Sequence, residues 1–103
     1  MLLRVIYKRE AGSPLEFIRI PDRLETLREL VDGYIETVTM DDGSWCVICD
    51  EGGLLKGKDF CCAVNGQPFY GPVIMIGVDR HDCCFTHMPL PADCWPGYDP
   101  EED

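Results

Sequence analysis

Residues 30–53, which read LVDGYIETVTMDDGSWCVICDEGG, constrain the fold more than any other part of the chain. Two β-rich runs, residues 34–40 and 45–49, flank the dipeptide Asp42-Gly43. That dipeptide is typical of the tight primed turns that close antiparallel hairpins. The stretch therefore predicts a β-hairpin, followed by an acidic glycine-containing loop over residues 50–58.

The turn also predicts the register of this hairpin, with Met40 opposite Trp45 and Glu36 opposite Cys49. Because successive side chains of a strand alternate between its faces, this register sorts the apolar residues into two sets. We expect the more apolar face to pack on a helix. Glu36 falls on that same face, where a carboxylate lies either at the wet end of the sheet or against a ligand or partner. The other residues of the face are Val38, Met40, Trp45 and Val47.

A helix is expected just before the hairpin, over residues 22–32. Asp22 is typical of an N-cap, and Glu25 stands where the capping box places an acid. Gly33 fits the left-handed residue that ends many helices. The apolar stripe at helical spacing comprises Leu24, Leu27, Leu30 and Val31.

The remaining strands frame this unit. Residues 2–7 and 15–20 predict two strands that are antiparallel, because their connection is too short for a crossover. The continuously apolar residues 73–78 predict a strand buried on both faces. Shorter strands are expected at 60–64 and 83–86, and a turn at 65–68. The fold class is therefore α+β: a small, mostly antiparallel sheet of about five or six strands with one main helix packed on one face.

Charge and composition narrow the function further. The net charge is −10, and all nine Lys and Arg residues lie at or before Arg80. A positively charged nucleic-acid-binding surface is therefore disfavoured, and no direct nucleic-acid binding is expected. We expect a single domain over residues 1–90, followed by a Pro-rich acidic tail over 91–103. That tail is either a solvated, disordered end or a segment that mimics or repels nucleic acid.

The chain has seven cysteines and no apolar run of about 20 residues. We therefore expect a cytoplasmic chain with free thiols and no membrane span. Cys46 and Cys49, with His81 and Cys84, could be combined into a zinc set. Strand alternation instead points Cys46 and Cys49 to opposite faces. We therefore expect no metal and no cofactor. A nucleophile with an orienting base is also not evident, so we expect no enzyme activity.

Eight residues are candidates for ligand binding, around the place where the open end of the hairpin meets the loop at 50–58. Large aromatic side chains could stack on a ligand base, although rim or core packing is the ordinary alternative. Cations on the loop could bound a polar pocket, although solvated charges are commoner. The candidates are Tyr34, Glu36, Trp45, Glu51, Lys56, Asn65, Tyr70 and Arg80.

Four segments resemble a known family in order and spacing. These are residues 27–38 (LRELVDGYIETV), residues 49–54 (CDEGGL), Asn65, and residues 71–77 (GPVIMIG). The chain resembles the domain-of-unknown-function family 3846, found largely in phages and mobile elements. Asp50 departs from that family, which has Asn at this position. The Cys- and Pro-rich stretch after Arg80 also departs from it.

The resemblance implies a small phage-type accessory protein that counters host defence without catalysis. Two mechanisms suit such a domain. The first is sequestration of a small nucleotide-derived signalling molecule, in a pocket that a homo-oligomer could share. The second is an acidic protein-binding inhibitor, or nucleic-acid mimic, that acts on a host defence protein.

Overall fold

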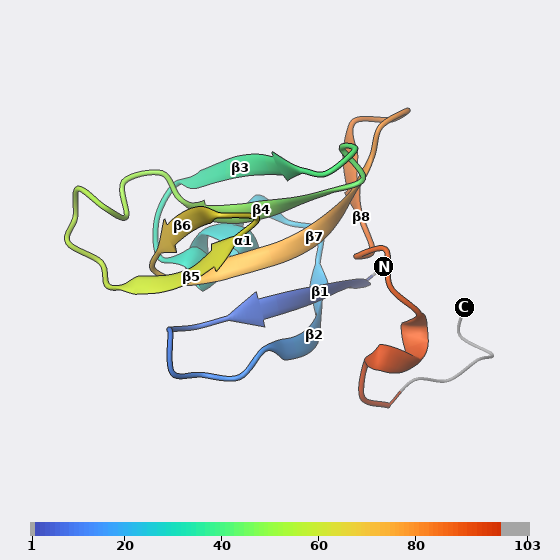
Figure 1. The fold of residues 1–103 in the computed structure, drawn as a ribbon. Helices are drawn as coiled ribbons and strands as arrows, with labels where there is room; N and C mark the ends of the chain where they lie inside the picture. The colour runs from blue at the N-terminus through green and yellow to red at the C-terminus, as the bar shows by residue number, and fades with distance from the viewer. Residues whose placement is uncertain (1, 98–103) are drawn as a thin grey trace.

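The computed structural model describes residues 2–97 (Figure 1). Eight strands, one α-helix and one short 3-10 helix follow one another along the described chain. They are β1 (Leu2–Lys8), β2 (Glu16–Pro21), α1 (Leu24–Val31), β3 (Ile35–Met40), β4 (Trp45–Asp50), β5 (Phe60–Val64), β6 (Gln67–Tyr70), β7 (Val73–Asp79), β8 (Cys84–Thr86) and η1 (Ala92–Cys94).

The main sheet has six strands, and all its pairings are antiparallel. Five strands run in the order β2-β1-β7-β4-β3, and β8 pairs with the end of β7. The expected antiparallel α+β sheet is confirmed. β7 is the central strand, and Val73, Ile74 and Ile76 are fully buried, because β7 is covered on both faces. Strands β5 and β6 form a separate two-stranded sheet.

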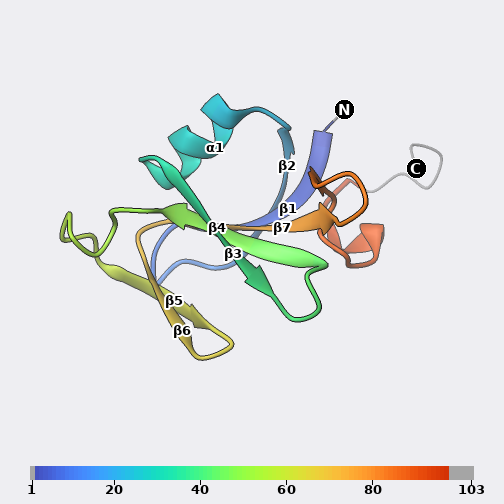
Figure 2. The ribbon, with the colours of Figure 1, turned by 90° about the horizontal axis from the view of Figure 1, so that it is seen from above.

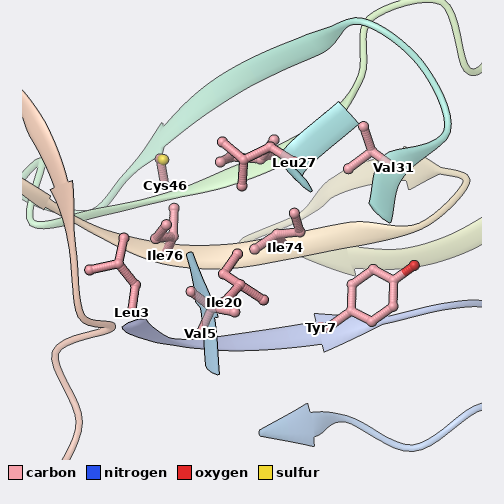
Figure 3. Close-up of a cluster of buried hydrophobic side chains, with 10 residues drawn as sticks. Leu3, Val5, Tyr7, Ile20, Leu27, Val31, Cys46, Ile74 and Ile76 are labelled. Atoms are coloured by element: carbon pink, nitrogen blue, oxygen red, sulfur yellow. The ribbon is translucent and has the colours of Figure 1, made fainter. Parts of the chain in front are cut away.

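The two faces of the main sheet carry different covers (Figure 2). On one face, Leu27 and Val31 of α1 are buried in a cluster with Cys46 and Ile48 of β4. Figure 3 shows Leu27, Val31 and Cys46 together with side chains of β1 and β7. On the other face, the β5–β6 hairpin covers the sheet.

The expectation that the more apolar face of the β3–β4 hairpin packs on the helix is wrong. Met40, Val47 and Cys49 pack against Cys61 and Phe69 of the β5–β6 hairpin and belong to a cluster separate from the helix. The turn expected at residues 65–68 is shorter, because Gln67 already starts β6. β5 and β6 therefore form a second hairpin, and this hairpin rather than the helix covers the apolar face of β3–β4.

The hairpin register is confirmed pair by pair, but the turn differs from the expected one. Four residues link β3 to β4, and the residues with positive φ are Asp41 (48°) and Gly43 (90°). Asp42 instead accepts a hydrogen bond from the Ser44 N–H. Two consecutive residues with positive φ, as a type I′ turn requires, occur at Asn65-Gly66 between β5 and β6.

The ends of α1 also differ from the prediction. Arg23, not Asp22, is the N-cap, because the β2 conformation extends through Pro21 and Arg23 N donates to the Pro21 carbonyl. Asp32, not Gly33, adopts the left-handed conformation, with φ of 56°. Gly33 is required for another reason: a Cβ there would lie 2.4 Å from Cγ of Asp50.

The chain after β8 packs on the body of the protein. Trp95 is 1% exposed, and its Nε1 donates to the carbonyl oxygens of Val5 and Ile18 at 3.0 and 3.1 Å. Its ring meets Phe17 edge to face at 5.3 Å. Within the Pro-rich acidic tail expected over residues 91–103, residues 92–97 include η1 and pack on the body of the protein through Trp95. The rest of that expected tail, residues 98–103, lies outside the described residues.

Candidate functional site

A buried ion cluster forms where the loop at residues 51–57 leaves β4. The Asp50 carboxylate is fully buried and lies 2.7 Å from Lys58 Nζ and 3.0 Å from Lys56 Nζ. It also accepts a hydrogen bond from the Gly52 N–H at 3.1 Å. Lys58 Nζ donates in addition to the carbonyl oxygens of Val31 and Asp32, at the C-terminal end of α1. The cluster therefore joins the helix end, the hairpin and the loop.

The electrostatics of this cluster are those of a structural ion pair. Burial raises the pKa of the Asp50 carboxyl, but hydrogen bonds from Lys58, Lys56 and Gly52 outweigh burial and lower the pKa to about 2. A cation near the last carbonyls of a helix is also favourable. Lys56, named as a ligand cation from the sequence, is thus engaged with Asp50, and about half of its side chain is exposed.

An acidic hollow lies beside this cluster, between the β3–β4 hairpin and β6. Its volume is about 280 Å³, near the lower end of the range for ligand pockets. Three of the eight predicted residues meet here: Glu36, Glu51 and Tyr70. None of the described residues that line the hollow is a cation, so it does not suit an anionic ligand. Tyr70 packs its ring edge to face on Phe60 at 6.0 Å.

A second hollow lies on the helix face of the sheet, next to β8, and we call it the Arg80 hollow. Its volume is about 460 Å³, within the usual range for small-molecule sites. Arg80 Nη1 donates to the Asp42 carbonyl at 2.7 Å, which holds the side chain across the β3–β4 turn. The hollow combines a guanidinium, hydroxyl groups, thiols and an apolar wall. Its lining residues are Thr37, Thr39, Gly43, Cys46, Val78, Arg80, Cys83 and Phe85.

The other predicted residues lie outside these two hollows. Tyr34 is 64% exposed, and the Arg28 guanidinium lies 5.0 Å from the centre of its ring. Trp45 donates from Nε1 to Asp41 Oδ2 at 2.9 Å and packs on the core. Asn65 donates to Asp41 Oδ1 at 3.1 Å, which connects the two hairpin turns. The eight candidates therefore do not form one pocket.

The lining of the Arg80 hollow contains one of the eight candidate ligand-binding residues, Arg80. Its other lining residues are not evident as ligand contacts from the sequence. Thr37 and Thr39 point to the helix side from the edge strand, and Phe85 reaches the hollow from β8, which pairs with β7. The alternation of Thr37 and Thr39 was the one local signal that could have found them. The contribution of Phe85 depends on a pairing between strands that short-range patterns do not specify.

The cysteines of the C-x-x-C pattern are separated by the sheet. Cys46 lies in the cluster under α1, and Cys49 lies in the cluster under β5–β6. Burial raises the pKa of each thiol to about 11, with a smaller contribution from Glu36 and Asp50 at Cys49. Both thiols are therefore protonated at neutral pH. Within residues 2–97, no group of three His, Cys, Asp or Glu side chains is placed to hold a metal ion.

The fold and its hollows define a small α+β domain with an antiparallel sheet and an open amphipathic site. Residues 3–91 match the family model described as "Domain of unknown function (DUF3846)". The chain belongs to this family, as the motifs in its sequence indicated. No curated protein and no solved structure matches the chain. Among the described residues, no helix is long and apolar enough to span a membrane.

Proposed function

We propose that the protein binds a small nucleotide-derived molecule in the Arg80 hollow and holds it without chemical change. The observation that carries this proposal is the combination of groups in one open site. The planar guanidinium of Arg80 suits a phosphate, and its one hydrogen bond within the described chain leaves further donors for a ligand. Phe85 and Val78 offer an apolar wall for a base.

The charge around the hollow limits the ligand. Asp42 is close enough to Arg80 that the guanidinium contributes to lowering the Asp42 pKa, after the larger effect of hydrogen bonds with Ser44. The chain as a whole carries −10. A ligand with one phosphate group therefore fits better than a polyphosphate, because the surrounding acids oppose each additional negative charge.

Retention without turnover fits the chemistry of the lining. Cys46, the buried thiol of the hollow, is held protonated because burial raises its pKa to about 11, so it is a poor nucleophile. The biological role that we assign follows from the family resemblance. In that role the protein is a phage-type accessory factor that removes a defence signal in the cytoplasm of the host cell.

The test is a binding and release experiment on the full chain. The purified protein is incubated with a panel of cyclic and linear nucleotide signals, washed, heated and analysed by mass spectrometry. We expect intact ligand in the eluate and about tenfold or greater loss of retention in Arg80→Gln. Arg9→Gln is the charge-matched control, because Arg9 is exposed and pairs with Glu16 away from this hollow. A degraded ligand would indicate an enzyme, and no retained ligand would overturn the proposal.

An exposed apolar loop favours a second candidate function, contact with a host protein. Leu55 is 94% exposed and Leu54 is 65% exposed, on the same loop as the acidic residue Glu51. Neighbouring apolar and acidic side chains on a loop suit a basic protein surface. Leu55→Ser would then abolish capture of a host protein, whereas Arg80→Gln would leave it unchanged. The opposite pattern would favour the ligand.

A further inference from the structure

The outer edge of β3 is an open hydrogen-bonding surface. Glu51 N donates to Tyr34 O, and Ser44 O, on the β7 side of β4, accepts from Val78 N. In an antiparallel ladder the bonded pairs alternate, so Glu36 and Val38 bond inward to β4. The N–H and C=O groups of Ile35, Thr37 and Thr39 consequently point outward. β3 is the last strand of the sheet, with no neighbour on this side among the described residues.

The opposite edge of the sheet is protected, whereas β3 is not. β2 ends in Pro21, carries the ion pair between Glu16 and Arg9, and is bound to the C-terminal segment through Arg19 and Pro96. Prolines, charges and covering segments are the usual means of blocking edge pairing. β3, with the sequence IETVTM, has no proline and no lysine, and Glu36 is its one charged residue.

We infer that β3 pairs with β3 of a second copy of this chain, antiparallel and in register at Thr37. A two-fold axis at Thr37 places Thr39 opposite the partner's Ile35, and Glu36 opposite the partner's Val38. No two like charges are directly opposite, so the strand is complementary to itself. The pairing is closed, because both copies use the same strand edge, which fits a dimer rather than a fibre.

The pairing has a direct consequence for the site. The axis is perpendicular to the sheet, so both copies present the same face on the same side. Thr37 and Thr39 border the Arg80 hollow in each copy. The two hollows therefore lie side by side along the new strand pair. The pairing itself does not rest on ligand binding.

The test measures molar mass without any ligand, so its failure is separate from failure of the proposed function. Light scattering coupled to size exclusion, under reducing conditions, should give about twice the chain mass of 11.7 kDa. Thr37→Pro removes an outward N–H but leaves the bonds to β4, as edge strands tolerate. It should weaken the dimer by about tenfold or more. Thr37→Ala, which keeps the N–H, is the control and should remain dimeric.

Two further measurements keep the result decisive. Thr39→Lys is a second variant that serves if Thr37→Pro does not fold. It adds a charge at the strand edge without affecting the backbone and should also yield monomers. Circular dichroism establishes folding of each variant. In the natural chain, amide exchange at Thr37 and Thr39 should slow as protein concentration rises. A monomer at all concentrations, or a dimer retained in folded Thr37→Pro and Thr39→Lys, would overturn the inference.

Discussion

Asp50 is a buried carboxylate at the centre of an ion cluster that joins the helix end, the hairpin and the following loop. Lys56 and Lys58 follow it on the loop, and Lys58 also binds carbonyl oxygens at the end of α1. Gly33 packs so closely on the carboxylate that a side chain there would collide with it. At this position an acid is stabilising only because both lysines approach it. Removing the acid would leave Lys58, which is largely buried, without its closest counter-charge.

Asp50→Asn should destabilise the fold at neutral pH by about 2 to 3 kcal/mol. Because the folded pKa of about 2 is below the ordinary value of 3.8, the ionised acid contributes stability above about pH 4. That contribution is lost as the pH falls from about 4 to about 2. Urea unfolding at pH 7 and pH 3 measures the difference. The exposed Asp22→Asn is the control, and an equal loss in both variants would contradict the prediction.

At the scale of elements, α1 and the β5–β6 hairpin cover opposite faces of one sheet. The β3–β4 hairpin has an apolar set on each of its faces, and the fold uses both. β8 is the most delicate addition, because it is three residues long and pairs only with the end of β7. After β8 the backbone passes over Gly77 of β7. The approach is so close that a Cβ on Gly77 would lie 2.0 Å from the His87 carbonyl oxygen.

Gly77→Ala should therefore displace β8 and open the side of the Arg80 hollow that Phe85 forms. The obstacle is backbone, which cannot rotate away as a side chain can, so we expect a loss of about 1 to 3 kcal/mol. Hydrogen exchange should be faster at residues 84–88. Gly12→Ala is the matched control, because no atom lies within 4 Å of the added Cβ. Unchanged exchange at residues 84–88 in Gly77→Ala would show that β8 is not held by this contact.

At the scale of the whole molecule, the C-terminal segment is fastened to the N-terminal strands. Trp95 is buried with Ile6 and Met88, and its indole bonds two carbonyl oxygens of β1 and β2. The Met88 N–H donates to the Arg4 carbonyl and the Arg4 N–H donates to His87 Nδ1. Residues more than 80 positions apart are thus held together, so the described end of the chain is part of the core.

Trp95→Ala should cost about 3 to 5 kcal/mol, the usual range for loss of a buried aromatic side chain. Trp95→Phe should cost less than Trp95→Ala, because it keeps most of the apolar contact with Phe17. Its remaining cost comes from the loss of the indole N–H and its hydrogen bonds. Thermal and urea denaturation measure both variants. Equal stability of Trp95→Ala and the natural chain would show that residues 91–97 do not contribute to the core.

The sequence by itself determined the local features. Helical spacing located α1, the continuous apolar run located β7, and the hairpin register followed from β-rich runs on either side of one turn. These features depend on residues close together in the chain, whose periodicity is visible without any tertiary contact. The same patterns also carried the family resemblance, because its motifs lie in those elements.

Only the tertiary structure decided which cover each face received and which polar residues met. The β3–β4 hairpin offers an apolar set on both faces, so its sequence could not choose between α1 and the β5–β6 hairpin. Lys56 and Lys58 pair with the buried Asp50. Arg80 is therefore the cation that borders the larger hollow. Burial and ion pairing depend on residues distant in sequence, and their energies are set by packing that a local pattern does not contain.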